Sequence, residues 1–149
     1  MRYPIILFVS IFSLVACNYA SDKVCTREEA MQAETESSTL KDWDSVYRAF
    51  KHFAHCDDGA IGEGYSDSVA RLLAQDWAHI GKANDLVSSD KKFERFVLRH
   101  IDELMSPTQA KIINENARVH CPAGVERLCK LIESRLSEVD RNLIQRKKL

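Results

Sequence analysis

The chain has 149 residues, of which 45% are hydrophobic and 29% are charged, the ordinary balance of one globular domain that buries its own core. The 21 Lys and Arg residues and the 22 Asp and Glu residues nearly cancel, which leaves a formal net charge of -1. No run of Lys and Arg interleaved with aromatic residues occurs outside the C-terminal tail, so the composition argues against nucleic acid as a partner.

The first residues have the order of a secretory signal peptide. Arg2 supplies a short positive start, and residues 5–16 are apolar apart from their serines. This run is too short for a permanent membrane-spanning helix, which needs about 20 apolar residues. We therefore expect residues 1–16 to direct export and then to be removed.

The sequence LVAC at positions 14–17 closes this segment and resembles the lipobox of bacterial lipoproteins. In that family a dedicated signal peptidase cuts before the cysteine, which then carries lipid. The resemblance implies that Cys17 anchors the chain to a membrane and that residues 17–24 form a tether. Because Asn18 is not Asp, it also implies the outer membrane. The alternative is an ordinary signal peptide, cut for instance after Ala20, which would release a soluble periplasmic protein.

Helical patterns fill the remaining domain, residues 25–149. Thr26 and Glu29 have the spacing of a capping box, which predicts the start of a weakly apolar helix. Apolar and aromatic residues then recur at steps of three and four over positions 40–55. This pattern is typical of a strongly amphipathic helix.

A third helix is predicted to begin after Asp57 or Asp58, either of which can act as its N-cap. Its apolar stripe runs through positions 61–80. Gly81 follows, as glycine commonly does after the end of a helix. The polar connection beyond it has room for a single turn near positions 84–87.

Three more helices are predicted in the C-terminal part. The first is capped by Ser89 or Asp90 and carries its apolar residues between positions 93 and 105. The second begins at the capping-box sequence of positions 106–109, and the last runs from Pro122 onward. Because no alternating strand pattern or internal repeat competes, we predict an all-α, single-domain helical bundle of about five to six helices.

Five cysteines are an odd number for an oxidising compartment. Setting Cys17 aside as the lipid carrier leaves an even set in which we expect two disulfides: Cys25, Cys56, Cys121 and Cys129. If the last helix begins at Pro122, Cys121 and Cys129 lie about 12 Å apart along its axis, beyond the reach of a bridge. They would then pair outward, one of them with Cys56, whereas a helix that begins later would permit the local pair.

The stretch 56–77 combines glycines with carboxylates. Its glycines at positions 59, 62 and 64 are poor helix formers, which predicts an irregular first turn or the close approach of another backbone. Glu63 and Asp67 share a helical face, and Arg71 is the expected ion-pair partner of Asp67. Glu63 and Asp67, together with Asp58, are the candidate partner-binding residues.

No catalytic group of residues stands out, and the catalytic residues stay unknown. The sequence GYSDS at positions 64–68 falls short of a nucleophile elbow, because it lacks the final glycine and a preceding strand. His52 and His55 lie one helical turn apart and are able to share a metal. A disulfide at Cys56 beside solvated histidines explains the same cluster, so we expect no metal and no cofactor. The other histidines are isolated and are expected to cap helices or lie at interfaces: His79, His100 and His120.

Three classes of function remain open. We favour an exported, membrane-anchored interaction protein that acts as an adaptor, an inhibitor or an immunity-type module against a periplasmic toxin, because its acidic patch suits a basic site on a protein partner. The second class is a small periplasmic hydrolase or metal-dependent enzyme that uses Glu63, Asp67 and the pair His52 and His55. The third class is a structural envelope lipoprotein without a specific ligand.

Overall fold

The computed structural model describes residues 23–148. The predicted signal peptide, Cys17 and most of the predicted tether lie outside the described residues. The described chain confirms the all-α prediction and contains seven α-helices and two short 3-10 helices: α1 (Arg27–Ser37), α2 (Trp43–Phe53), η1 (Ala54–Cys56), α3 (Gly59–Gln75), η2 (Trp77–His79), α4 (Ile80–Ser89), α5 (Lys91–Arg99), α6 (Pro107–Val119) and α7 (Glu126–Arg146). Within this part of the chain, no helix has both the length and the apolar character to cross a membrane.

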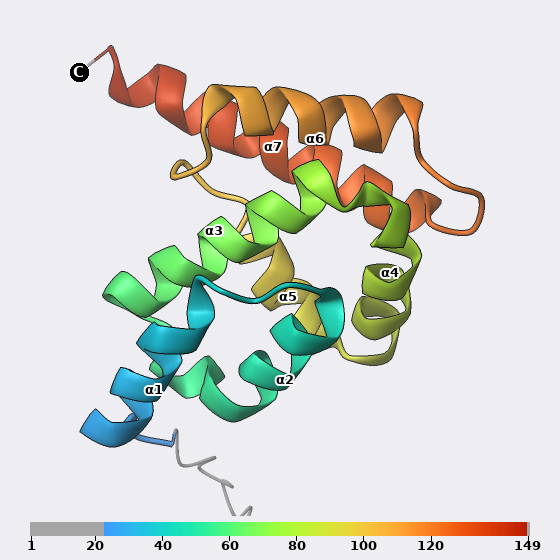
Figure 1. The fold of residues 1–149 in the computed structure, drawn as a ribbon. Coiled ribbons are helices and arrows are strands. Elements are labelled where there is room, and N and C mark those ends of the chain that lie inside the picture. Colours follow the sequence, from blue (N-terminus) through green and yellow to red (C-terminus); the bar gives the residue numbers. More distant parts are fainter. Residues whose placement is uncertain (1–22, 149) are drawn as a thin grey trace, which may run out of the picture.

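Helix α3 lies across the middle of the molecule (Figure 1). It packs against α1 on one side and against α6 on the other, and α6 pairs in antiparallel fashion with α7. Helices α4 and α5 pack on each other and, with α2, complete the bundle. The ends of the molecule therefore differ, because α1 lies at one end and the pair of α6 and α7 at the other.

The core is one continuous cluster centred on α3. Tyr65 and Val69 of α3 are fully buried, as is Ile132 of α7, and burial of such a side chain contributes about 1.5–3 kcal/mol. The aromatic residues predicted on α2 meet those of α5. Ring centroids of Phe50 and Phe96 lie 5.0 Å apart in a tilted arrangement, a favourable geometry for aromatic pairs.

The predicted helix starts are confirmed where a side chain can cap its own backbone. Thr26 and Glu29 form the capping box of α1, Asp58 caps α3 and Asp90 caps α5. The second helix begins later than expected, because Asp42 is its N-cap.

The predicted continuous helix over positions 61–80 is wrong. Helix α3 ends at Gln75, and a new helix, α4, replaces the expected polar connection, so Gly81 lies inside a helix rather than beyond one. A tertiary contact accompanies the break: the indole of Trp77 donates to the backbone carbonyl of His120, 43 positions away. The fifth helix also ends early, at Arg99 instead of position 105.

Both expected disulfides are present, but the outward pairing is wrong. The bridges join Cys25 to Cys56 and Cys121 to Cys129. The local pair forms because α7 begins at Glu126 rather than Pro122, so a turn with a left-handed Gly124 (φ 84°) brings the two Cα atoms within 6.2 Å. Two disulfides in one chain indicate an oxidising, extracytoplasmic location.

Candidate functional site

The structure brings two of the three candidate partner-binding residues together. Glu63 and Asp67 are both exposed on α3 and line a hollow of about 160 Å³, with Leu104 and Gln109 on its opposite side. Asp58 lies apart from this hollow, because its carboxylate accepts from the amide of Gly59 as the cap of α3.

The expected ion pair between Asp67 and Arg71 is not formed. The Arg71 guanidinium instead donates to the backbone carbonyl of Leu40 at 2.7 Å and to the hydroxyl of Ser68 at 3.3 Å. Neither Glu63 nor Asp67 takes part in an ion pair within residues 23–148. The hollow therefore presents two carboxylates that have no cation beside them in the described chain.

A buried network of hydrogen-bonded polar side chains lies behind the hollow, and the sequence analysis did not identify it. The Ser66 hydroxyl, which forms part of the hollow's wall, lies 3.0 Å from His100 Nδ1. His100 Nε2 lies 3.1 Å from a carboxylate oxygen of Asp57, which also pairs with the guanidinium of Arg99. The partners are 34 to 43 positions apart in the sequence, so no short sequence motif contains them together.

This hydrogen-bond network contains the residue types of a Ser-His-Asp triad, but the direction of its hydrogen bonds does not suit a serine nucleophile. Ser66 donates to Asp102 at 2.6 Å, so its one proton is directed away from His100 Nδ1. Asp57 lies 3.1 Å from the other ring nitrogen of His100. A general base has to accept the serine proton, and Ser66 is only 2% exposed. The arrangement is suited to holding helices together.

The network fixes the connection between α5 and α6. Asp102 is held by Ser66 on one oxygen and accepts from the Leu104 amide on the other. The Arg135 side chain of α7 donates to the carbonyls of Leu98 and Ile101 at 3.1 and 3.0 Å. The polypeptide around Leu104 is therefore tied to both α3 and α7.

The connection projects an apolar side chain from this rigid base. Leu104 is 58% exposed. Beyond it, a groove of about 570 Å³ runs between α6 and α7, and Met105 lines both the groove and the acidic hollow. Two partly exposed residues of α7, Leu143 and Ile144, line the far side of the groove.

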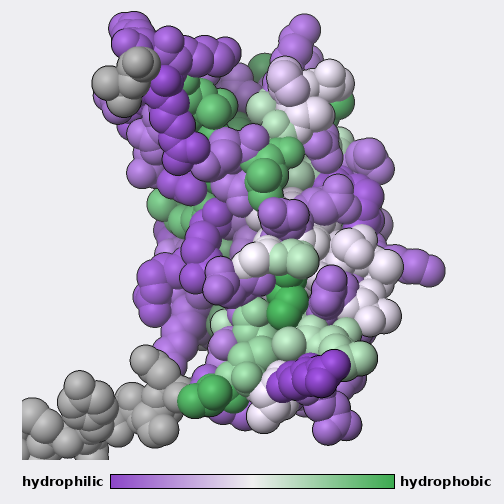
Figure 2. Space-filling model, turned by 90° about the vertical axis from the view of Figure 1, so that its left-hand side faces the viewer, coloured by the Kyte–Doolittle hydropathy of each residue, from purple (hydrophilic) through white to green (hydrophobic). Residues whose placement is uncertain are grey.

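The two hollows belong to one face of the molecule. Figure 2 looks onto the side from which α3 and the end of α7 project, and it shows apolar side chains as a broken column between hydrophilic margins. The groove carries charges of both signs, including Lys111 and Lys147 as well as Asp140. This face therefore combines carboxylates at one end, apolar side chains in the middle and mixed charge at the other end.

Comparison of the chain with models of protein families, with curated proteins and with solved structures finds no match.

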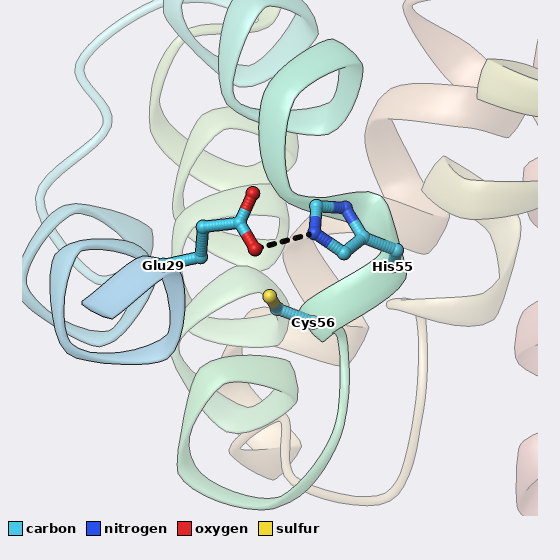
Figure 3. Close-up of side chains that lie close together, drawn as sticks. All are labelled: Glu29, His55 and Cys56. Carbon is cyan, nitrogen blue, oxygen red and sulfur yellow. Dashed lines mark ion pairs between the residues drawn. The ribbon is translucent and has the colours of Figure 1, made fainter. Parts of the chain in front are cut away.

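The two candidate histidines, His52 and His55, point to different places. His52 is exposed on α2 and lines a separate groove between α1 and α2. His55 turns its Nε2 toward Glu29 of α1, 3.3 Å from the carboxylate, with the sulfur of Cys56 close by (Figure 3). Because the Cys56 sulfur is bonded to Cys25, it is not a metal ligand in this disulfide form.

Glu29 is the carboxyl group of this cluster, and its surroundings shift its pKa. The ammonium of Lys23, the amide of Thr26 and the imidazole of His55 lower the pKa of Glu29 to about 2. Glu29 also caps α1. It therefore stays ionised throughout the ordinary pH range while it joins the start of α1 to η1.

Proposed function

We propose that this chain is an exported, membrane-anchored interaction protein of the adaptor, inhibitor or immunity type. It binds a protein partner through the face that carries Leu104, Glu63 and Asp67. One observation carries the proposal: an exposed leucine lies on a connection that hydrogen bonds tie to two helices, between an acidic hollow and a groove lined by apolar and charged side chains. A rigid anchor loses little conformational freedom on binding.

The chemistry of the face selects the kind of partner. Glu63 and Asp67 lack a cation in the described chain, so they favour a Lys or Arg on the partner. Leu104, together with Leu143 and Ile144, favours apolar side chains next to that cation. The partner is thus an exported protein that presents a basic residue at one end of an apolar segment.

The position of the face also suits an anchored protein. The described chain begins beside α1, and α6 and α7 form the opposite end of the molecule (Figure 1). A lipid on Cys17 would hold the α1 end near the membrane, which leaves the groove between α6 and α7 accessible from the periplasm.

Site-specific photo-cross-linking tests the binding face. A benzophenone amino acid replaces Leu104 in the full chain, expressed in its own host. The matched control replaces Val119, which is 69% exposed but lines neither hollow. We expect one discrete protein adduct from position 104 and none from position 119.

Charge reversal distinguishes specific binding from nonspecific adhesion, and its effect is measured as the amount of the same adduct. Glu63→Lys combined with Asp67→Lys should reduce the adduct by about tenfold or more, because like-charge contacts cost several kcal/mol. Glu28→Lys combined with Glu34→Lys, on the exposed side of α1, is the control and should leave it unchanged. Three results would overturn the proposal in favour of a structural lipoprotein. These are equal amounts of adduct from positions 104 and 119, adducts with lipid alone, or an adduct that Glu63→Lys with Asp67→Lys does not reduce.

A separate experiment tests the predicted lipid anchor on Cys17. Intact mass spectrometry of the envelope-extracted protein should find a mature chain that begins at Cys17 and carries acyl chains. A chain that begins after Ala20 without lipid would instead identify a soluble periplasmic protein.

A further inference from the structure

The cluster of Glu29, His55 and Cys56 has a property that partner binding does not use. One ligand atom from each of these residues lies within 4.8 Å of the other two. The fourth neighbour is Cys25, whose sulfur is bonded to that of Cys56. All four residues lie where the start of α1 meets η1. Figure 3 shows three of them, Glu29, His55 and Cys56.

His55 is positioned to act as a metal ligand. His55 Nε2 is buried and makes no hydrogen bond within the described residues, although the Glu29 carboxylate faces it at 3.3 Å. Tetrahedral zinc has bonds of roughly 2.0–2.3 Å to nitrogen, oxygen and sulfur, so its ligand atoms lie about 3.3–3.8 Å from one another. The distance between His55 and Glu29 already fits one edge of such a site.

We propose that reduction of the Cys25–Cys56 disulfide converts this cluster into a binding site for Zn²⁺ or a similar thiophilic divalent cation. The two thiolates and His55 Nε2 supply three ligands, and Glu29 supplies the fourth. In this form the cation, instead of the disulfide, holds the start of α1 against η1.

The interconversion balances with one named co-reactant. A dithiol reductant transfers two electrons and two protons to the disulfide, so the sulfur–sulfur bond breaks, two thiols form and the reductant becomes a disulfide. Binding of the cation then displaces the two thiol protons. A disulfide oxidant reverses the process: it takes two electrons from the two thiolates and two protons from water and becomes a dithiol, while the sulfur–sulfur bond re-forms. The cation is then expelled, because a disulfide sulfur is a poor ligand.

Glu29 is the weakest of the four ligands. Its oxygens already accept from Lys23 and from the backbone and hydroxyl of Thr26, and the cation has to compete with these contacts. His55 Nε2 has the Glu29 carboxylate as its neighbour, and that carboxylate would bind the same cation. Loss of His55 should therefore cost more affinity than loss of Glu29.

Cobalt binding tests the site, because Co²⁺ bound by thiolate has a characteristic charge-transfer absorption. The mature protein is reduced with a phosphine under anaerobic conditions and titrated with Co²⁺ and then Zn²⁺, with helicity followed by circular dichroism. We expect one Co²⁺ per reduced chain, displaced by Zn²⁺, and none in the oxidised chain. If reduction loosens α1, one equivalent of Zn²⁺ should restore its helicity.

Matched variants assign the ligands. The pair Cys121→Ala and Cys129→Ala removes the other disulfide and should bind Co²⁺ as the wild type does, whereas the pair Cys25→Ala and Cys56→Ala should not bind it. His55→Ala should weaken binding by about 100-fold or more, since even an outer-shell partner is worth roughly 10–100-fold. Glu29→Gln should have a smaller effect, and His52→Ala should have none.

Three results would overturn the proposal: no thiolate-to-cobalt band in the reduced wild type, an affinity unchanged by His55→Ala, or a loss of helicity on reduction that Zn²⁺ does not reverse. Each result would leave the cysteines as a structural bridge only.

Discussion

Gly64 of α3 packs directly against Ser37 at the end of α1. A Cβ atom at position 64 would lie 2.1 Å from the Ser37 hydroxyl oxygen, 2.9 Å from its Cβ and 3.0 Å from the amide nitrogen of Ser38. This contact explains one of the three glycines that weaken the helix propensity of α3, because a second backbone does approach there. It also places α1 beside the buried part of α3, where the Ser68 hydroxyl donates to the Ser37 carbonyl at 2.6 Å.

Gly64→Ala should therefore destabilise the protein by about 1–3 kcal/mol, the cost of forcing backbone shifts in a packed interface. Gly81→Ala is the matched control, because a Cβ at that helical position meets nothing within 4 Å. It should stabilise the protein by up to about 1 kcal/mol. Urea unfolding measures both changes, and two shifts of the same sign would contradict the packing argument.

Asp57 and Asp58 are neighbours with different roles, and substitutions should separate them. Asp57→Ala leaves the buried His100 without its acceptor, which should cost about 2–4 kcal/mol. Asp58→Ala removes only the N-cap of α3 and should cost about 1 kcal/mol. Equal urea midpoints for the two variants would show that the hydrogen-bond network of His100 contributes little to stability.

The two disulfides should contribute unequally because they close loops of different length. Their cysteines are 31 and 8 positions apart. Loop-closure entropy then predicts a loss of about 3.7 kcal/mol for the pair Cys25→Ala and Cys56→Ala, and about 2.5 kcal/mol for the pair Cys121→Ala and Cys129→Ala. Denaturant midpoints test the order, and a larger loss from the shorter loop would refute it.

Glu94 joins α5 to α7 by accepting from Arg127, and this contact lowers the pKa of its carboxyl group below the ordinary value of 4.5. A lowered pKa in the folded state stabilises the fold above the ordinary value, and the contribution is lost as the pH falls through the folded pKa.

Glu94→Gln should thus lower stability at pH 7 by about 0.5–1 kcal/mol, a value limited by the partly exposed arginine. The difference from wild type should disappear in acid. The control, Glu115→Gln on the exposed side of α6, should differ little from wild type at any pH. Urea unfolding at several pH values makes the comparison, and a difference for Glu94→Gln that persists in acid would exclude the ionic explanation.

The local sequence was sufficient for the helical class and for most helix starts. Thr26 with Glu29 and Ser106 with Gln109 form their capping boxes as expected, because donor and acceptor are three residues apart and need no other part of the chain. The number of cysteines likewise predicted two disulfides. Glu63 and Asp67, which the sequence singled out, do line one hollow, and their role in partner binding stays a prediction.

Only the tertiary structure decided which distant residues meet. The break after Gln75 accompanies the contact of Trp77 with His120, and the pairing of Cys121 depends on a turn that delays α7. Ser66, His100 and Asp57 assemble because α3 and α5 pack together, and that network sets the position of Leu104. Periodicity records which face of a helix is apolar, but it carries no information about which helix covers that face.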